Sequence, residues 1–146
     1  HQRLKELKMY SMERRRERYM IIYGWQQLEG KKENVLKLKT SGRSGTRRIQ
    51  LGDEKYSGSD DIRILPSVKT QLINSPARQT ERLFNCMPKH LRESTGVTVD
   101  TFKKHLDEWL MEEVPDQPKC EGYRVAATSN SIFDQYSHYK RVGGQR

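Results

Sequence analysis

Apolar residues recur at spacings of three and four along three stretches of the chain, which is the pattern of an amphipathic helix. The first stretch predicts a helix over Met12–Leu28. Ser11 precedes it, and a serine hydroxyl can accept a hydrogen bond from an unpaired backbone N–H of the first turn. The apolar face expected for this helix comprises Met12, Tyr19, Ile21, Ile22, Trp25 and Leu28.

Two further helices follow from the same pattern. Pro76 suits the first position of a helix because its missing N–H would be unpaired there, and the second helix is expected over Ala77–Cys86. A short helical turn follows over Pro88–Arg92, and Thr98 is expected to cap a third helix over Val99–Glu113. The outward positions of that helix are Lys103, Lys104, Asp107 and Glu108. The expected core, shared by both tryptophans, comprises Ile21, Ile22, Trp25, Leu83, Phe84, Phe102, Leu106 and Trp109.

A period of two, typical of strands, occurs over residues 35–51, on either side of a polar, glycine-rich loop at 41–46. This pattern predicts a small β-hairpin. Leu4 and Leu7 predict a short helix that packs on the same face as the first long one. Few apolar residues follow Pro115 and Pro118, which predicts an extended, mobile tail.

The expected fold class is therefore α+β, mainly α, with about three main helices, a small β-hairpin insertion and a mobile C-terminal tail. Four segments are expected along the chain. They are a basic N-terminal helical segment at 1–30, a basic hairpin and acidic loop at 31–74, a helical module at 75–114, and the tail at 115–146.

Composition narrows the class of protein. The 146 residues include 28 Lys and Arg against 19 Asp and Glu, so the net charge is +9, while only 33% of residues are hydrophobic. A basic chain with so small an apolar fraction favours a module that contacts polyanions over a self-sufficient enzyme. No apolar run approaches the ~20 residues that span a bilayer. The charged start lacks the pattern of a signal peptide, and two cysteines cannot form a disulfide scaffold.

These features predict an intracellular protein, nuclear or cytoplasmic, that is not secreted and does not contact a membrane. The chain begins with His1 rather than Met, which favours a segment of a longer protein.

Two basic clusters are candidates for phosphate contact, because the planar arginine side chain can donate two parallel hydrogen bonds to a phosphate. The first comprises Arg14, Arg15, Arg16 and Arg18, and the second comprises Lys37, Lys39, Arg43, Arg47 and Arg48. Tyr19, Tyr23 and Trp25 follow the first cluster and could offer stacking faces, but they are assigned to the core. The alternative interpretation of the first cluster is a solvated helix end, with Glu13 and Glu17 pairing locally with arginines. For the second cluster, the alternative is a mobile surface loop.

Catalytic and metal-binding patterns are weak. Asp60 and Asp61 are similar to the metal-binding pair of polymerase palms, but their polar upstream flank favours a turn. Cys86 and His90 lack the second closely spaced ligand pair of a zinc site, so Cys86 is expected to pack as a small apolar group. No catalytic residue, metal or cofactor is predicted in this chain.

The order of several blocks resembles the C-terminal end of reverse transcriptases from jockey-like non-LTR retrotransposons. The blocks are Leu4–Leu7, Tyr10–Tyr23 with Trp25, Arg82–Arg92, Thr98–Asp107, Val114–Pro118, Gly122-Tyr123 and Asn130-Ser131. The specific ones are Arg82-Leu-Phe-Asn, followed by Pro88, and Val99-Asp-Thr-Phe-Lys103. Together they span about residues 3 to 135.

The resemblance implies an RNA-directed DNA polymerase whose palm and fingers, with their Mg²⁺, lie upstream of His1. This chain would then be noncatalytic thumb and post-thumb sequence. Its partners would be that palm and an RNA–DNA or DNA duplex, which it would hold through contacts to the sugar–phosphate backbone of the nucleic acid. Two alternatives stay open: a protein-interaction module in which the Phe102–Leu110 helix docks a partner, and a decayed element fragment without function.

Overall fold

The computed structural model describes residues 2–38, 40, 47–49, 75–117 and 130–141. The helices in these ranges are α1 (Gln2–Glu6), α2 (Met12–Leu28), α4 (Pro76–Cys86), α5 (Lys89–Arg92), α6 (Val99–Glu112) and α7 (Ile132–Arg141). The described part of the chain is thus mainly helical and contains no strand.

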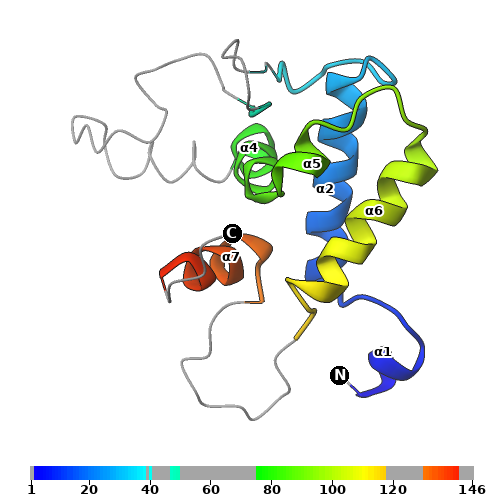
Figure 1. Cartoon of the computed structure of the whole chain (residues 1–146), viewed down its shortest axis with the longest axis vertical. Coiled ribbons are helices and arrows are strands. Elements are labelled where there is room, and N and C mark those ends of the chain that lie inside the picture. The colour runs from blue at the N-terminus through cyan, green and yellow to red at the C-terminus, as the bar shows by residue number, and fades with distance from the viewer. Residues whose placement is uncertain (1, 39, 41–46, 50–74, 118–129, 142–146) are drawn as a thin grey trace.

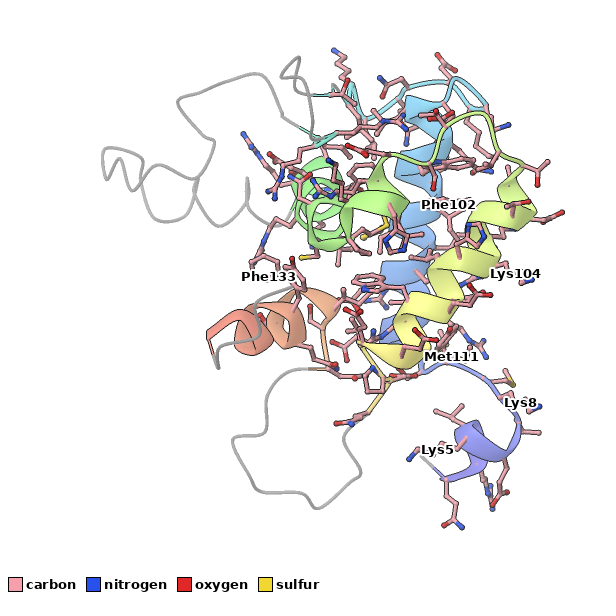
Figure 2. The ribbon with its side chains drawn as sticks, in the orientation of Figure 1. Lys5, Lys8, Phe102, Lys104, Met111 and Phe133 are labelled. Atoms are coloured by element: carbon pink, nitrogen blue, oxygen red, sulfur yellow. The ribbon has the colours of Figure 1, made fainter. Side chains whose placement is uncertain are left out.

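Helix α2 runs through the middle of the assembly, with α6 along one side and α4 along the other (Figure 1). Helix α2 contacts both of these helices, α4 also contacts α7, and α5 contacts α6. Helix α1 stands apart near the N-terminus, and Figure 2 shows Lys5 and Lys8 on this separate segment.

The three long helices begin where the sequence predicts, because each start is fixed by local chemistry. The Ser11 hydroxyl accepts from the Arg14 N–H at 3.3 Å, and the Thr98 hydroxyl accepts from the Thr101 N–H at 3.2 Å. Ser75 accepts from Arg78 in the same way, ahead of proline at the first helical position. Each cap satisfies a backbone donor that the helix itself leaves unpaired.

The predicted core is confirmed. All eight residues expected there are buried, and both tryptophans belong to one cluster, as does Cys86. The Trp25 ring stacks on Phe102, with centroids 4.3 Å apart and planes 3° from parallel, and Phe102 points from α6 toward α2 (Figure 2). The Trp25 indole N–H donates to the Ser94 carbonyl at 2.9 Å, so burial leaves no polar atom of this ring unpaired.

Part of the apolar face predicted for α2 is wrong. Met12 is 72% exposed and Tyr19 is 70% exposed, whereas Arg14, on the other side of the helix, is fully buried. The predicted packing of α1 is also wrong, because α1 buries no residue and Leu7 is 66% exposed. An arginine takes part of the inward face that the hydrophobic pattern assigned to Met12.

The hairpin expected over 35–51 is reduced, among described residues, to one antiparallel bridge between Thr40 and Ile49. Lys37 has a φ of +54°, which is not a strand conformation. Side-chain amides take the place of strand partners: Asn34 bonds both the N–H and the carbonyl of Leu38, and Asn85 does the same for Ile49. These bonds allow the buried Leu38 and Ile49 to join the core without a sheet.

The extended tail expected over 115–146 is corrected at Ile132–Arg141, where the chain forms α7. Ile132 is fully buried at the start of this helix. Its backbone N–H donates to both carboxylate oxygens of Glu17, at 3.2 and 3.1 Å. A carboxylate at a helix N-terminus satisfies unpaired donors and complements the helix dipole. Helix α7 therefore depends on α2, which lies more than a hundred residues earlier.

Candidate nucleic-acid interface

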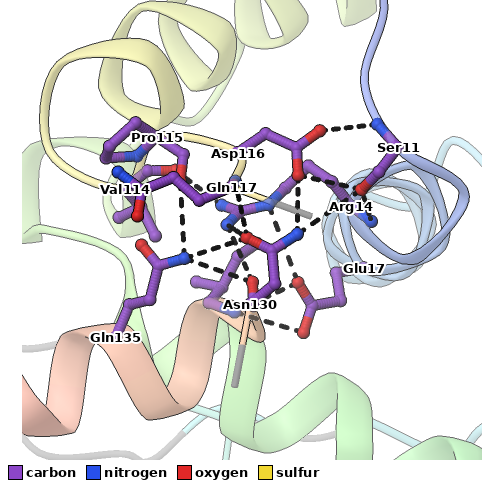
Figure 3. Close-up of polar contacts among 10 residues, drawn as sticks. Ser11, Arg14, Glu17, Val114, Pro115, Asp116, Gln117, Asn130 and Gln135 are labelled. Atoms are coloured by element: carbon purple, nitrogen blue, oxygen red, sulfur yellow. Dashed lines mark hydrogen bonds and ion pairs between the residues drawn. The ribbon is translucent and has the colours of Figure 1, made fainter. Parts of the chain in front are cut away.

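The four arginines of the first basic cluster lie on two different sides of α2. Arg14 donates to the Val114 carbonyl at 2.7 Å and to the Asn130 carbonyl at 2.9 Å (Figure 3). Its Nε lies 3.9 Å from a Glu17 oxygen. Burial lowers the pKa of the Arg14 guanidinium below its ordinary value, and the nearby Glu17 and Asp116 carboxylates oppose that shift. Arg14 therefore links α2 to Val114, which follows α6, and to Asn130, which precedes α7, and its burial keeps it from contacting a phosphate.

Asp116 completes a set of polar contacts around Arg14 that we call the Arg14 network. It accepts from the Ser11 hydroxyl at 2.8 Å and from the Asn130 side chain at 2.7 Å. Burial alone would raise the pKa of Asp116, but the hydrogen bonds from Asn130 and Ser11 and the Arg14 charge hold it below its ordinary value. The residues of the Arg14 network are Ser11, Arg14, Glu17, Asp116, Asn130 and Gln135.

Arg18 also bonds inside the protein. Its Nε and Nη2 lie 2.6 and 2.8 Å from the two carboxylate oxygens of Asp107, which is a bidentate pair between α2 and α6. The Tyr10 hydroxyl donates to the same carboxylate at 3.1 Å. Burial, with the Asp107 charge, raises the pKa of Tyr10 to about 12. Asp107, predicted to face outward, thus ties α6 to α2, and Arg18 is committed to it.

The other two arginines lie on a different side of α2. Arg15 is partly exposed and Arg16 is exposed, and neither forms an ion pair with another described residue. They line a surface hollow of about 390 Å³ with four other side chains of the same helix. We call this surface the outer face of α2, and it comprises Met12, Arg15, Arg16, Tyr19, Met20 and Tyr23.

The second basic cluster is described only in part. Lys37 and Arg48 are exposed. Arg47 forms an ion pair with Glu29, with 2.6 Å between Nη1 and Oε1, so this residue is engaged within the protein. Lys39 and Arg43, both candidates for phosphate contact, lie outside the described residues.

Arg92 is a further basic residue, outside the two basic clusters that the sequence predicts. It is 6% exposed, and its Nε donates to the Met87 carbonyl at 2.9 Å. Burial and the neighbouring Arg48 charge lower its pKa. Arg92 therefore bonds within the protein and lies near the Arg48 charge. The sequence gives no signal that this single arginine, at the end of a short helix, is buried.

The protein-interaction alternative required a free apolar face on α6. Phe102, Leu106 and Leu110 are all fully buried in the core. These residues pack within the protein, so their side chains do not form an exposed docking face for that alternative.

No group of three His, Cys, Asp or Glu side chains within the described ranges is arranged to hold a metal ion. Asp60 and Asp61 lie outside those ranges. None of the helices described has both the length and the apolar character needed to cross a bilayer.

Comparisons with protein-family models, with curated proteins and with solved structures found no match to this chain. The function must therefore be inferred from the residues themselves.

Proposed function

We propose that this chain is a noncatalytic C-terminal segment of the RNA-directed DNA polymerase of a non-LTR retrotransposon, and that it holds a nucleic-acid duplex through basic residues. The order of the sequence blocks supports the choice of parent enzyme. The observation that carries the binding role is the outer face of α2, where Arg15 and Arg16 are free of acidic partners among the described residues.

Phosphate binding requires donors that are not already used. Arg14, Arg18 and Arg47 bond carbonyl or carboxylate oxygens of the protein itself. Arg15 and Arg16 form no ion pair with another described residue, so their donors can serve a ligand, and with a net charge of +9 the whole chain attracts a polyanion. The described residues proposed to contact phosphate are therefore Arg15, Arg16, Lys37 and Arg48, with Lys39 and Arg43 as further candidates from the sequence.

Fluorescence anisotropy of a labelled RNA–DNA hybrid, measured across a salt series, tests this proposal. The logarithm of affinity should fall linearly with the logarithm of salt concentration, because phosphate contacts release counterions. The double variant Arg15→Ala/Arg16→Ala should reduce the magnitude of that slope by about 1 for each phosphate that is no longer bound. The matched control is Lys103→Ala/Lys104→Ala, which removes the same charge from α6 and should leave binding nearly unchanged.

Two results would count against the proposal. The first is the absence of hybrid binding by the folded chain at low salt. The second is an equal loss in both double variants, since that would make binding a property of net charge rather than of this surface. Circular dichroism of each variant establishes that it is folded before its affinity is compared.

A further inference from the structure

The outer face of α2 exposes large apolar side chains that the core does not use. Met12 and Tyr19 are mostly exposed, and Tyr23 is 36% exposed. Scattered apolar residues on a surface are ordinary, but a contiguous exposed patch marks a contact site. These side chains gather in the same hollow as Arg15 and Arg16.

Helix geometry places the aromatic side chains in a row. Residues 12, 16, 19 and 23 are separated by four, three and four positions, which puts them on one face of a helix. Tyr19 and Tyr23 are one turn apart, about 6 Å along the axis. The Lys32 ammonium lies 5.9 Å from the centre of the Tyr23 ring. The face thus presents two successive rings, with cations at each end.

The chemistry of the lining selects the occupant. The charged lining residues are both arginines, so the ligand should be anionic. All six lining side chains come from a single helix, and they provide no opposite wall. The anchor residues of protein partners favour well-packed, desolvated pockets, whereas a nucleic-acid base can stack on an exposed ring face.

We infer that the outer face of α2 binds an unpaired nucleic-acid strand at the point where it leaves the duplex, with bases stacked on Tyr19 and Tyr23 beside the phosphates that Arg15 and Arg16 contact. Bases inside a duplex are covered on both faces by their neighbours, so away from the duplex ends a ring can stack only on an unpaired base. The inference rests on the proposed function and deepens it, because it assigns the two tyrosines of this face to the single strand that continues from the duplex.

The test compares two probes, a blunt RNA–DNA hybrid and the same hybrid with a short unpaired extension that contains 2-aminopurine. The fluorescence of 2-aminopurine falls when the base stacks, so it reports stacking directly. The wild-type chain should bind the extended probe at least about 5-fold more tightly than the blunt one, from the typical strength of base–aromatic stacking, and should quench the extension.

Two double variants separate the aromatic ring from the hydroxyl. Tyr19→Leu/Tyr23→Leu removes both rings, so it should lose the preference for the extended probe and the quenching, while it keeps the affinity for the blunt hybrid. Tyr19→Phe/Tyr23→Phe keeps the rings and should retain both effects. Because both positions are exposed, neither variant should change the fold. Quenching of the extension by the wild-type chain also tests base stacking without any variant.

The two proposals fail in different ways. Equal affinity for both probes without quenching would overturn the inference and leave duplex binding intact. No binding of either probe would overturn the proposed function and the inference together. Binding of an acidic, apolar peptide that Tyr19→Leu/Tyr23→Leu abolishes, with no quenching of the extension, would assign this face to a protein partner instead.

Discussion

Arg14 and Arg16 are two positions apart in the same basic run, yet the structure gives them opposite roles. Two positions on a helix correspond to about 200°, so one side chain enters the protein when the other faces outward. Arg14 is fully buried and has its bonds supplied by residues 114 and 130. The sequence shows the run of arginines, but it does not show which of them later segments will cover.

Arg14→Met should strongly destabilise the protein. Methionine has a similar length but cannot donate, so the Val114 and Asn130 carbonyls and the nearby carboxylates would lose a buried partner. The expected cost is about 2–4 kcal/mol in the free energy of unfolding, measured by urea denaturation. Arg16→Met, on the exposed side, should stay within about 0.5 kcal/mol of wild type. An Arg14→Met variant as stable as wild type would mean that the Arg14 network does not stabilise the fold.

Gly24 offers a second prediction at this scale. A helix interior normally favours alanine over glycine by about 1 kcal/mol. Here a Cβ on Gly24 would lie 2.5 Å from the Thr80 methyl group, where α2 meets α4. Gly24→Ala should therefore lower the melting temperature, at a cost of about 1–3 kcal/mol. Adding Thr80→Ser, which removes that methyl group, should restore much of the loss; an unchanged deficit would place the strain elsewhere.

At the scale of elements, the sequence predicts the helices whose starts are fixed by neighbouring residues, but it does not predict the one that depends on a distant residue. The caps at Ser11 and Thr98 and the proline at 76 fix helix starts through neighbouring atoms alone, so the sequence places α2, α4 and α6 nearly correctly. The sequence pattern does not predict helix α7, because the first N–H of this helix is satisfied by Glu17, which lies far away in the chain. The sequence names the basic residues, but which of the described arginines bond within the protein depends on the same distant contacts.

Ile132→Ala tests whether α7 belongs to the core. The side chain is fully buried where α7 begins, so the truncation should cost about 2–4 kcal/mol. Met111→Ala, at a position 64% exposed on α6, is the control and should change stability little. Hydrogen exchange across 132–141 should accelerate in the first variant. Unchanged exchange there would mean that α7 forms independently of its packing.

For the molecule as a whole, polar contacts join segments that are distant in the chain. Arg18 and Tyr10, near the N-terminus, meet at Asp107 of α6. The Arg14 network joins the start of α2 to Asp116 and Asn130. Contacts across about a hundred residues raise the contact order of the fold, and a large loop must close before they can form. The outer face of α2 is left free because the opposite face of the helix carries these connections.

The Tyr10–Asp107 contact makes the stability of the fold depend on pH. The pKa of Tyr10 is raised from 10.0 to about 12 in the folded protein. The unfolded chain therefore loses this proton first, so the stabilisation is complete below pH 10 and is lost as pH rises toward about 12. Urea denaturation from about pH 8 upward should show stability falling over that interval.

Tyr10→Phe isolates this contribution from the other groups that titrate in alkali. The variant should lose about 1 kcal/mol at about pH 8, because it removes a hydrogen bond to a carboxylate. Its stability should then fall less steeply than that of wild type above pH 10. Tyr19→Phe removes a hydroxyl from an exposed position and should keep the wild-type slope. If Tyr10→Phe also kept that slope, the alkaline loss would arise elsewhere, and the link from Tyr10 through Asp107 to α6 would not contribute to closing the fold.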